Sequence, residues 1–253
     1  LVTLIGSIMA NTDVFMLGIW RNATEIGCYA SVQRIQLFII IIPSMIAAAV
    51  FPLTLRLAVS DSERFTAILE KTISIGMLVG IPIAVGGILL AEPIIALLFG
   101  QGYIAAAPIL QVLMATLIFS FPLVFLSNAI FAINKQKNLA LAYLFGMLGN
   151  VALNILLIPQ FGAVGSAIAT LISTGIITWF VWYKVRAIHY FKVIPKLKKV
   201  IFATIIMAGG IAMLDYFGFG ILPTILVATA VYFGSLLALR ESLITDIRSI
   251  FKK

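Results

Sequence analysis

Long apolar stretches separated by short polar connectors run through almost the whole chain. A helix needs about 20 apolar residues to cross about 30 Å of hydrocarbon, because each residue adds about 1.5 Å of rise. By that criterion the pattern predicts eight spans, near residues 1–20, 27–55, 66–90, 104–131, 138–158, 163–185, 197–215 and 219–239. We therefore predict an all-α integral membrane fold of about eight transmembrane helices.

Prolines lie inside several of these predicted spans. Pro43 and Pro52 fall in the second span, Pro82 in the third and Pro122 in the fourth. Proline removes a backbone donor and clashes with the preceding turn, so these helices are expected to be kinked or tilted.

Composition supports the bilayer as the environment. Hydrophobic residues make up 62% of the chain and charged residues 10%, with a mean hydropathy of +1.18. A soluble domain carries about a quarter charged residues, so this chain has too few polar groups to cover its apolar surface. The net charge of +8 does not indicate nucleic acid, because the basic residues lie between apolar runs rather than on one soluble face.

The basic residues also predict an orientation. All but two of the seventeen lysines and arginines follow even-numbered spans, the exceptions being Arg21 and Arg34. Cytoplasmic loops are enriched in Lys and Arg. We therefore predict a multi-pass protein of the inner (cytoplasmic) membrane whose first helix enters from the cytoplasm and whose C-terminus is cytoplasmic.

A long basic connector, Arg186–Lys199, precedes the last two spans. It predicts a break in organisation between residues 1–186 and residues 187–253. The tail Arg240–Lys253 combines apolar residues at helical spacing with basic ones. It is either a short helix on an anionic leaflet or a charged end that only sets topology.

The chain offers little material for catalysis or metal binding. It has one cysteine, Cys28, and one histidine, His189. These exclude an internal disulfide and a multi-cysteine metal site. We expect no catalytic residues, no metal site and no cofactor.

Two charged residues lie within predicted spans, where charge is costly and usually faces a protein interior or water. Asp13 precedes the end of the first span by seven residues, and Arg34 follows the start of the second by the same offset. Both should therefore lie about 10 Å from the outer end of their helices. Polar residues surround them: Asn11, Thr12, Gln33 and Gln36. Asp13, Arg34, Asn11, Gln33 and Gln36 are therefore the candidate lining of a polar cavity, in which Asp13 could also bind a cation; the alternative is a buried Asp13–Arg34 salt bridge that fixes packing.

Two further asparagines are interpreted as packing residues. Asn150 and Asn154 are four residues apart on one helical face, beside Gly146 and Gly149. Small residues allow close approach of helices, and amides can hydrogen-bond across the contact. The small-residue stretch Gly162–Ala167 predicts another close contact.

The chain opens on Leu1-Val2-Thr3-Leu4, without a methionine or the pattern of a signal peptide. We therefore expect it to be the C-terminal part of a longer protein.

Several short motifs recur in a defined order along residues 10–175. They are Asp13–Gly18 (DVFMLG), Gly27–Ala30 (GCYA), Phe51–Leu53 (FPL), Gly80–Val85 (GIPIAV), Ala91–Ile95 (AEPII), Leu98–Tyr103 (LFGQGY), Asn150–Asn154 (NVALN), Ile158-Pro159 and Gly162–Thr170 (GAVGSAIAT). In order and spacing the chain resembles polysaccharide flippases of the Wzx type, in the multidrug/oligosaccharidyl-lipid/polysaccharide exporter superfamily. It resembles lipid II flippases more loosely.

The resemblance implies two six-helix lobes around a central cavity, often with two further helices. Residues 1–186 would then be the second lobe and residues 187–253 would hold the extra pair, while the N-terminal lobe of the same protein is missing. The implied activity is the transfer of undecaprenyl-diphosphate-linked oligosaccharide between leaflets of the cytoplasmic membrane during surface polysaccharide (lipopolysaccharide) biosynthesis. Arg34 would meet the diphosphate, or Gln33 would hold the corresponding position, and the implied partners include a polysaccharide polymerase and glycosyltransferases.

Two alternatives compete with this reading. The first is a cation-coupled multidrug exporter of the same superfamily, which should prefer an acidic cavity. The second is a membrane enzyme acting on lipid-linked glycans. Such enzymes generally need catalytic groups on sizeable loops, whereas the outward connectors here are short, with few ionisable residues: Arg21, Glu25, Glu92 and Asp215. We therefore predict a transporter and not an enzyme.

Overall fold

The computed structural model describes residues 2–239, with side chains from residue 11 onward, and every regular element in that range is helical. The helices run in the order α1 (Val2–Trp20), α2 (Ala23–Ser60), α3 (Ser62–Leu89), α4 (Ala91–Phe99), α5 (Ala107–Ala132), α6 (Gln136–Arg186), α7 (Lys198–Tyr216) and α8 (Ile221–Ala238). Two short 3-10 helices, Gln101–Ala106 and Ile194–Leu197, precede α5 and α7. The tail Arg240–Lys253 lies outside the described residues.

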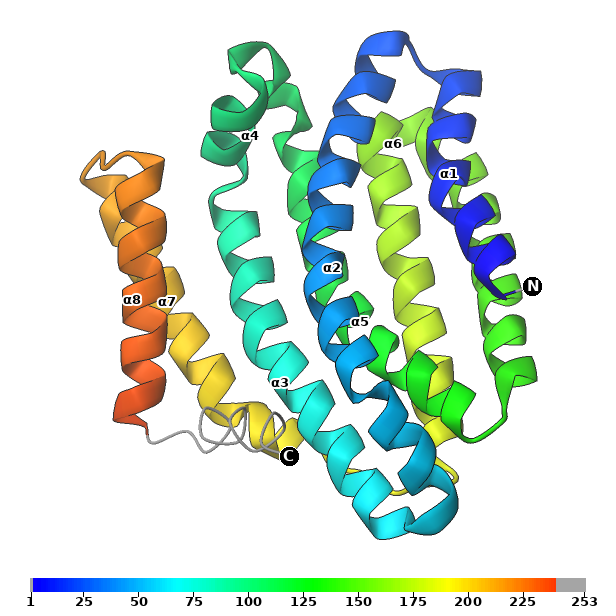
Figure 1. The fold of residues 1–253 in the computed structure, drawn as a ribbon. Helices are drawn as coiled ribbons and strands as arrows, with labels where there is room; N and C mark the ends of the chain where they lie inside the picture. Colours follow the sequence, from blue (N-terminus) through cyan, green and yellow to red (C-terminus); the bar gives the residue numbers. More distant parts are fainter. Residues whose placement is uncertain (1, 240–253) are drawn as a thin grey trace.

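Helix α6 accounts for two of the predicted spans. It covers 51 residues, but Gly162 has a non-helical backbone (φ 58°, ψ −138°) and the chain reverses there. Figure 1 shows the two halves running in opposite directions beside α1 and α2. Among the described residues, six helical segments are long and apolar enough to cross a membrane, and they contain α2, α3, α5, α6, α7 and α8. Helix α1 corresponds to the first predicted span. With α6 folded back on itself, each of the eight predicted spans corresponds to a helical segment, and the all-α membrane fold is confirmed.

The connector after α3 differs from the prediction, which placed no helix in residues 91–103. It forms α4 and the 3-10 helix Gln101–Ala106. Pro93 lies in the first turn of α4, where no backbone donor is needed. Gly100 ends α4 with φ 84°, a conformation that glycine adopts without strain.

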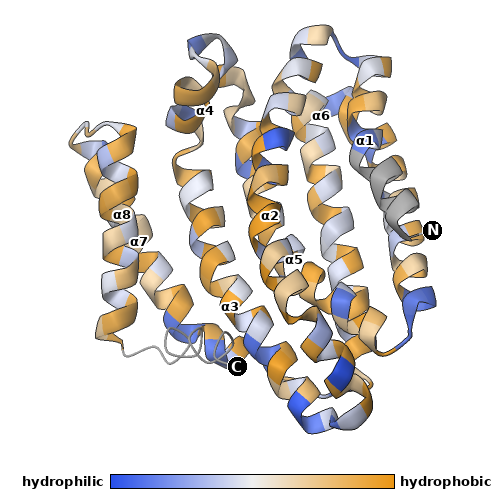
Figure 2. Ribbon diagram, viewed as in Figure 1, coloured by the Kyte–Doolittle hydropathy of each residue, from blue (hydrophilic) through white to orange (hydrophobic). Residues whose placement is uncertain are grey.

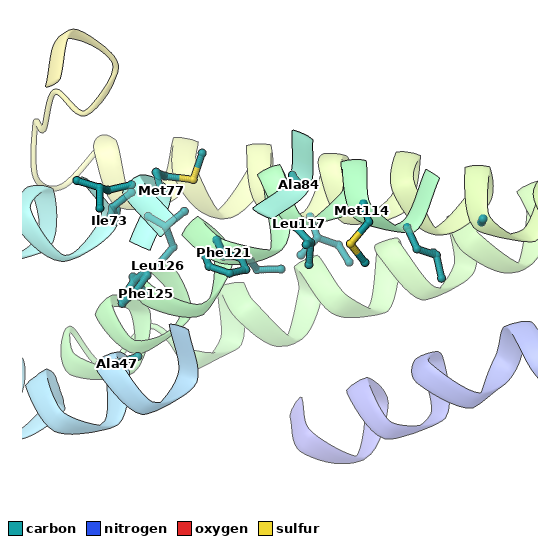
Figure 3. Packing of buried hydrophobic residues seen from close by; sticks show 14 of the residues in the cluster. Ala47, Ile73, Met77, Ala84, Met114, Leu117, Phe121, Phe125 and Leu126 are labelled. Atoms are coloured by element: carbon teal, nitrogen blue, oxygen red, sulfur yellow. The ribbon is translucent and has the colours of Figure 1, made fainter. Parts of the chain in front are cut away.

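Helices α3 and α5 form the centre of the core. Three glycines of α3 face α5 and leave no room for a side chain: Phe125 lies against Gly76, Phe121 against Gly80 and Met114 against Gly87. Figure 3 labels Phe121, Phe125 and Met114 among the buried residues of this core. Small residues such as glycine let membrane helices approach closely. Here the large side chains of α5 occupy the space that the three glycines leave open.

The last two helices pack on each other, and α7 contacts α3 (Figure 1). One buried hydrogen bond fixes α8 on α3: the Tyr232 hydroxyl donates to the Leu78 carbonyl at 2.6 Å. Pro82 lies four residues after Leu78 and has no N–H to occupy that carbonyl within the helix. The proline therefore frees the acceptor that Tyr232 uses.

The polar residues gather at the two ends of the bundle, with an apolar band between them (Figure 2). One end carries the α2–α3 and α5–α6 turns and the α6–α7 connector. The other carries the α1–α2 turn, the reversal at Gly162 and the α7–α8 turn. The connectors that hold most of the lysines and arginines therefore lie together at one end.

Candidate functional site

The buried carboxylate of Asp13 is the centre of a polar network. Its Oδ2 atom accepts hydrogen bonds from the Tyr29 hydroxyl (2.8 Å) and the Thr170 hydroxyl (2.6 Å). Its Oδ1 atom accepts one from the Asn154 amide (2.8 Å). Asp13 is only 3% exposed, so these three donors replace the water that an ionised carboxylate would otherwise need.

The network joins four helical segments. Asp13 lies on α1, Tyr29 on α2, and Asn154 and Thr170 on the two halves of α6. Asn150 extends it, because its amide donates to Thr170 at 3.4 Å and its oxygen accepts from Asn154 at 3.0 Å. The predicted hydrogen bonding of Asn150 and Asn154 across helices is therefore confirmed.

A cavity of about 390 Å³ adjoins this network, and we call it the polar cavity because eight of its thirteen lining residues carry a polar side-chain group. It is lined by α1, α2, α5 and α6, with these residues on its wall: Asp13, Tyr29, Gln33, Gln36, Leu37, Ile40, Ser120, Leu123, Val124, Tyr143, Thr170, Thr174 and Ile177. Of the five candidate residues named from the sequence, the structure thus brings Asp13, Gln33 and Gln36 to one cavity. Asn11 and Arg34 do not line it.

The alternative of a buried Asp13–Arg34 salt bridge is wrong. All three of the hydrogen bonds described for Asp13 go to other residues, and Arg34 is exposed on α2. Equal depth in two helices was not sufficient, because the direction of each side chain around its helix also decides whether the two can meet.

A second polar cluster joins the α1–α2 turn to the reversal in α6. The Arg21 guanidinium donates to the carbonyls of Ile158 (2.7 and 3.1 Å) and Pro159 (2.9 Å), at the end of the first half of α6. Glu25 accepts from the Ala163 N–H (3.2 Å), at the start of the second half. Each charge thus lies at the helix end whose dipole favours it.

Gly162 is required in this turn. Its φ of 58° disfavours any side chain, and a Cβ atom there would collide with the Glu25 carboxylate. The close contact predicted for the small-residue stretch Gly162–Ala167 is present, because a side chain at Gly165 would collide with the backbone of Leu157.

Sequence reasoning missed Tyr29 and Thr170 as partners of Asp13, and Arg21 and Glu25 as partners of α6. A signal was available for Thr170, since it follows Ser166 by four residues on the small-residue face of α6. Asn22 and Glu25 match the spacing of a helix N-cap, and Asn22 indeed accepts from the Glu25 N–H at 2.9 Å. Nothing local indicated that Arg21 reaches residues 137 positions away.

The network offers oxygen atoms that suit a small hard cation or a proton. Asn154 Oδ1 and Ser166 Oγ are buried and have no hydrogen-bond partner among the described residues. Carboxylate, amide and hydroxyl oxygens are ligands of hard cations. The described residues contain no cluster of three or more His, Cys, Asp or Glu.

A separate apolar cavity of about 380 Å³ lies between the last two helices and the rest of the bundle. Its wall comes from α2, α3, α4, α5, α7 and α8 and includes Pro82, Met114, Met207 and Tyr232. Almost all of its lining is hydrocarbon or aromatic, which suits an apolar chain.

Comparison with curated proteins finds flippases and a transporter. The chain is 25% identical over 167 residues to the probable low-salt glycan biosynthesis flippase Agl15 of Haloferax volcanii, covering 66% of this chain and 35% of that protein. It is 27% identical to the probable flippase AglR of the same organism (64% and 34%) and 27% identical to a putative O-antigen transporter of Shigella flexneri (66% and 40%). The chain therefore spans between a third and two fifths of the length of these relatives.

Solved structures share the fold. An inward closed conformation of the lipid II flippase MurJ superposes with a TM-score of 0.82 at 22% identity, over 96% of this chain and 53% of that one. A MOP superfamily transporter from Pyrococcus furiosus superposes with a TM-score of 0.62 at 16% identity, over 85% and 52%. The likeness at this identity concerns the fold, and the chain again covers about half of each structure.

The sequence model of one family extends over most of the chain. The model described as "Lipid II flippase MurJ" matches residues 18–232, which include every helix from α2 to α7. With the shared fold and the flippase relatives, this match shows that the chain belongs to the lipid II flippase MurJ family.

Proposed function

We propose that this chain is the second lobe, with two accessory helices, of a flippase that moves a polyprenyl-diphosphate-linked oligosaccharide across the cytoplasmic membrane. Its family and the glycan flippases among its relatives support this assignment. The remaining lobe would complete the pathway. Residues 1–186 would form the lobe that faces it, and residues 187–253 the accessory unit.

The observation that carries the proposal is the polar cavity beside Asp13, enclosed by apolar helices. A hydrated glycan and a diphosphate cross hydrocarbon only at a high free-energy cost. A cleft whose polar wall is exposed to one side and then to the other lowers that cost without covalent chemistry. Gln33 and Gln36 offer amide groups for hydroxyls of the glycan.

Asp13 is proposed as the group that couples this movement to a cation or a proton. Its carboxylate connects α1, α2 and both halves of α6. Neutralising the charge would weaken the three hydrogen bonds that hold these segments together.

Arg34 is proposed to meet the diphosphate from outside the lobe. Its side chain is exposed and has no hydrogen-bond or ion-pair partner among residues 11–239. It directly follows Gln33, which lines the cavity. A cation in this position can pair with an anion held between the two lobes, and a guanidinium is well matched to phosphate oxygens.

The apolar cavity between α3, α7 and α8 is proposed to receive part of the lipid carrier. Its hydrocarbon lining offers a glycan almost no hydrogen-bond partners but suits isoprenoid units. Lipid and sugar portions of one substrate would thus occupy different parts of this half of the protein.

The basic end of the bundle supports an orientation in the membrane. The α2–α3 turn, the α5–α6 turn and the α6–α7 connector are proposed to face the cytoplasm, because positive residues are retained there. A polymerase and glycosyltransferases acting before or after transfer are the expected partners.

The test is a flippase assay on the full-length protein. Surface glycan is measured in a strain that lacks the native gene and expresses wild-type or Arg34→Ala protein at equal levels. We expect Arg34→Ala to abolish surface glycan and Arg34→Lys to restore part of it. Normal glycan from Arg34→Ala would remove Arg34 from the mechanism.

The same strains separate the proposal from a multidrug exporter. If the protein leaves surface glycan unchanged but lowers the accumulation of cationic dyes, and Asp13→Asn abolishes that export, the lipid-linked glycan is not the substrate.

A further inference from the structure

The connector between α6 and α7 has a regular inner and outer side. Phe191 and Val193 are buried, whereas Tyr190, Lys192 and Ile194 are exposed. Alternation of this kind is the property of an extended segment. The outer side therefore presents an aromatic ring, a cation and an apolar side chain in succession.

Contacts with Glu70 and with Trp182 hold this segment in place. Both carboxylate oxygens of Glu70, on α3, are used: one accepts from the Lys192 backbone N–H (2.6 Å) and the other pairs with the Lys196 ammonium (2.5 Å). On the inner side Phe191 packs on Trp182, with ring centroids 4.7 Å apart. The outer side is thus already ordered, which lowers the entropic cost of binding a ligand there.

Two cations flank the exposed ring of Tyr190. The Arg186 guanidinium carbon lies 4.9 Å from the ring centroid, and the Lys192 ammonium lies 5.4 Å from it. Neither forms an ion pair with a residue between 11 and 239. Arg186, and then Lys192, lower the pKa of the Tyr190 phenol below its ordinary value of 10, because they favour negative charge at its oxygen.

The residues near Tyr190, Arg186 and Lys192 indicate how deep these three side chains lie relative to the membrane surface. Trp179 and Tyr183 stack with centroids 6.2 Å apart near the end of α6, and both side chains are largely exposed. Tryptophan and tyrosine concentrate where hydrocarbon meets headgroups. Ile188 and Ile194, also exposed, lie beside the cations in the connector.

We propose that Arg186, Tyr190 and Lys192, here called the Tyr190 cluster, form a binding site for the phosphate headgroup of an anionic phospholipid. The guanidinium, the ammonium and the phenol O–H supply donors around one ring, and a phosphodiester supplies the matching acceptors and charge. This inference goes beyond the proposed transport activity and does not depend on which molecule is carried.

A membrane lipid fits the cluster better than free phosphate. The exposed Ile188 and Ile194 would be left in water by a free ion but would be covered by the acyl region of a lipid.

The experiment uses the full-length protein in detergent, titrated with phosphatidylglycerol or phosphatidylcholine and followed by native mass spectrometry. We expect wild type to retain phosphatidylglycerol in preference to phosphatidylcholine. The double variant Arg186→Ala/Lys192→Ala should bind phosphatidylglycerol about tenfold to thirtyfold more weakly, because it removes both charged donors that flank the ring. Tyr190→Phe should lose less, because it keeps the ring and both cations.

The matched control is Lys135→Ala/Lys137→Ala, which removes the same charge from exposed positions at the α5–α6 turn, on the same end of the bundle. It should retain phosphatidylglycerol binding. Equal weakening in both double variants would overturn the proposal, because charge alone would then account for binding. Inorganic phosphate that competes as well as phosphatidylglycerol, mole for mole, would overturn the assignment to a lipid.

Discussion

The polar cavity beside Asp13 and the apolar cavity beside Tyr232 have almost the same volume, about 390 and 380 Å³. They are built in different ways. The polar cavity depends on a buried charge that needs three donors from three helical segments. The apolar cavity depends on shape, with one hydrogen bond from Tyr232 to α3 at its wall.

The difference teaches what each region can tolerate. A buried carboxylate is costly unless every donor is in place, so its surroundings accept little change. An apolar wall can be repacked by residues of similar volume at a small cost. We therefore expect substitutions to have larger effects in the polar region than in the apolar one.

Asp13→Asn should have the largest effect. The carboxamide keeps the shape of the carboxylate but removes its charge and directs an N–H₂ group at one of the three donors. Each hydrogen bond to a charged group that is lost costs about 1.5–3 kcal/mol, so thermal stability in detergent should fall and surface glycan should drop to background. Glu92→Gln, the same change at an exposed residue, is the control. Full activity of Asp13→Asn would show that the charge has no role.

Gly162→Ala should be next. It forces a side chain into a left-handed backbone conformation and against the Glu25 carboxylate, at a cost of about 1–3 kcal/mol. The melting temperature of the purified protein measures this. Gly149→Ala is the matched control, because a Cβ atom there meets no other atom within 4 Å. Equal melting temperatures for the two variants would contradict the structure of the turn.

Tyr232→Phe tests the apolar region. It leaves the buried Leu78 carbonyl without its partner, which costs about 1–3 kcal/mol. In a Pro82→Ala background the new Ala N–H can bond to Leu78, so the same substitution should cost less. A double-mutant cycle on melting temperatures measures this coupling. Tyr216→Phe, at a residue 85% exposed, is the control. Additive effects of the two substitutions would mean that Pro82 is not what leaves the Leu78 carbonyl free for Tyr232.

A pH dependence at His189 should be the smallest effect. Burial lowers the pKa of this histidine from its ordinary value of 6.5. Between the folded and unfolded values the unfolded state binds more protons, so stability is fully present above pH 6.5 and falls as the pH drops through the folded pKa. His189→Gln should remove this slope. A slope unchanged in the variant would assign it to another group.

The positions of the spans followed from the sequence because the bilayer imposes a length on every apolar segment. The same pattern could not show that the chain reverses between residues 138–158 and 163–185 through the positive φ of Gly162. It also left open whether Asp13 would pair with Arg34. Asp13, Gln33 and Gln36 could be picked out from the sequence, because polar side chains in a membrane span are costly unless they face a protein interior or water.

The sequence by itself determined the membrane environment, the succession of helices and the separation of basic connectors from the others. These depend on each segment's own length, hydropathy and charge. The tertiary structure decided the partners: Tyr29, Asn154 and Thr170 for Asp13, and Leu78 for Tyr232. Such contacts depend on the rotation of each helix about its axis, which is set by the packing of all the helices together and is not encoded in any single segment.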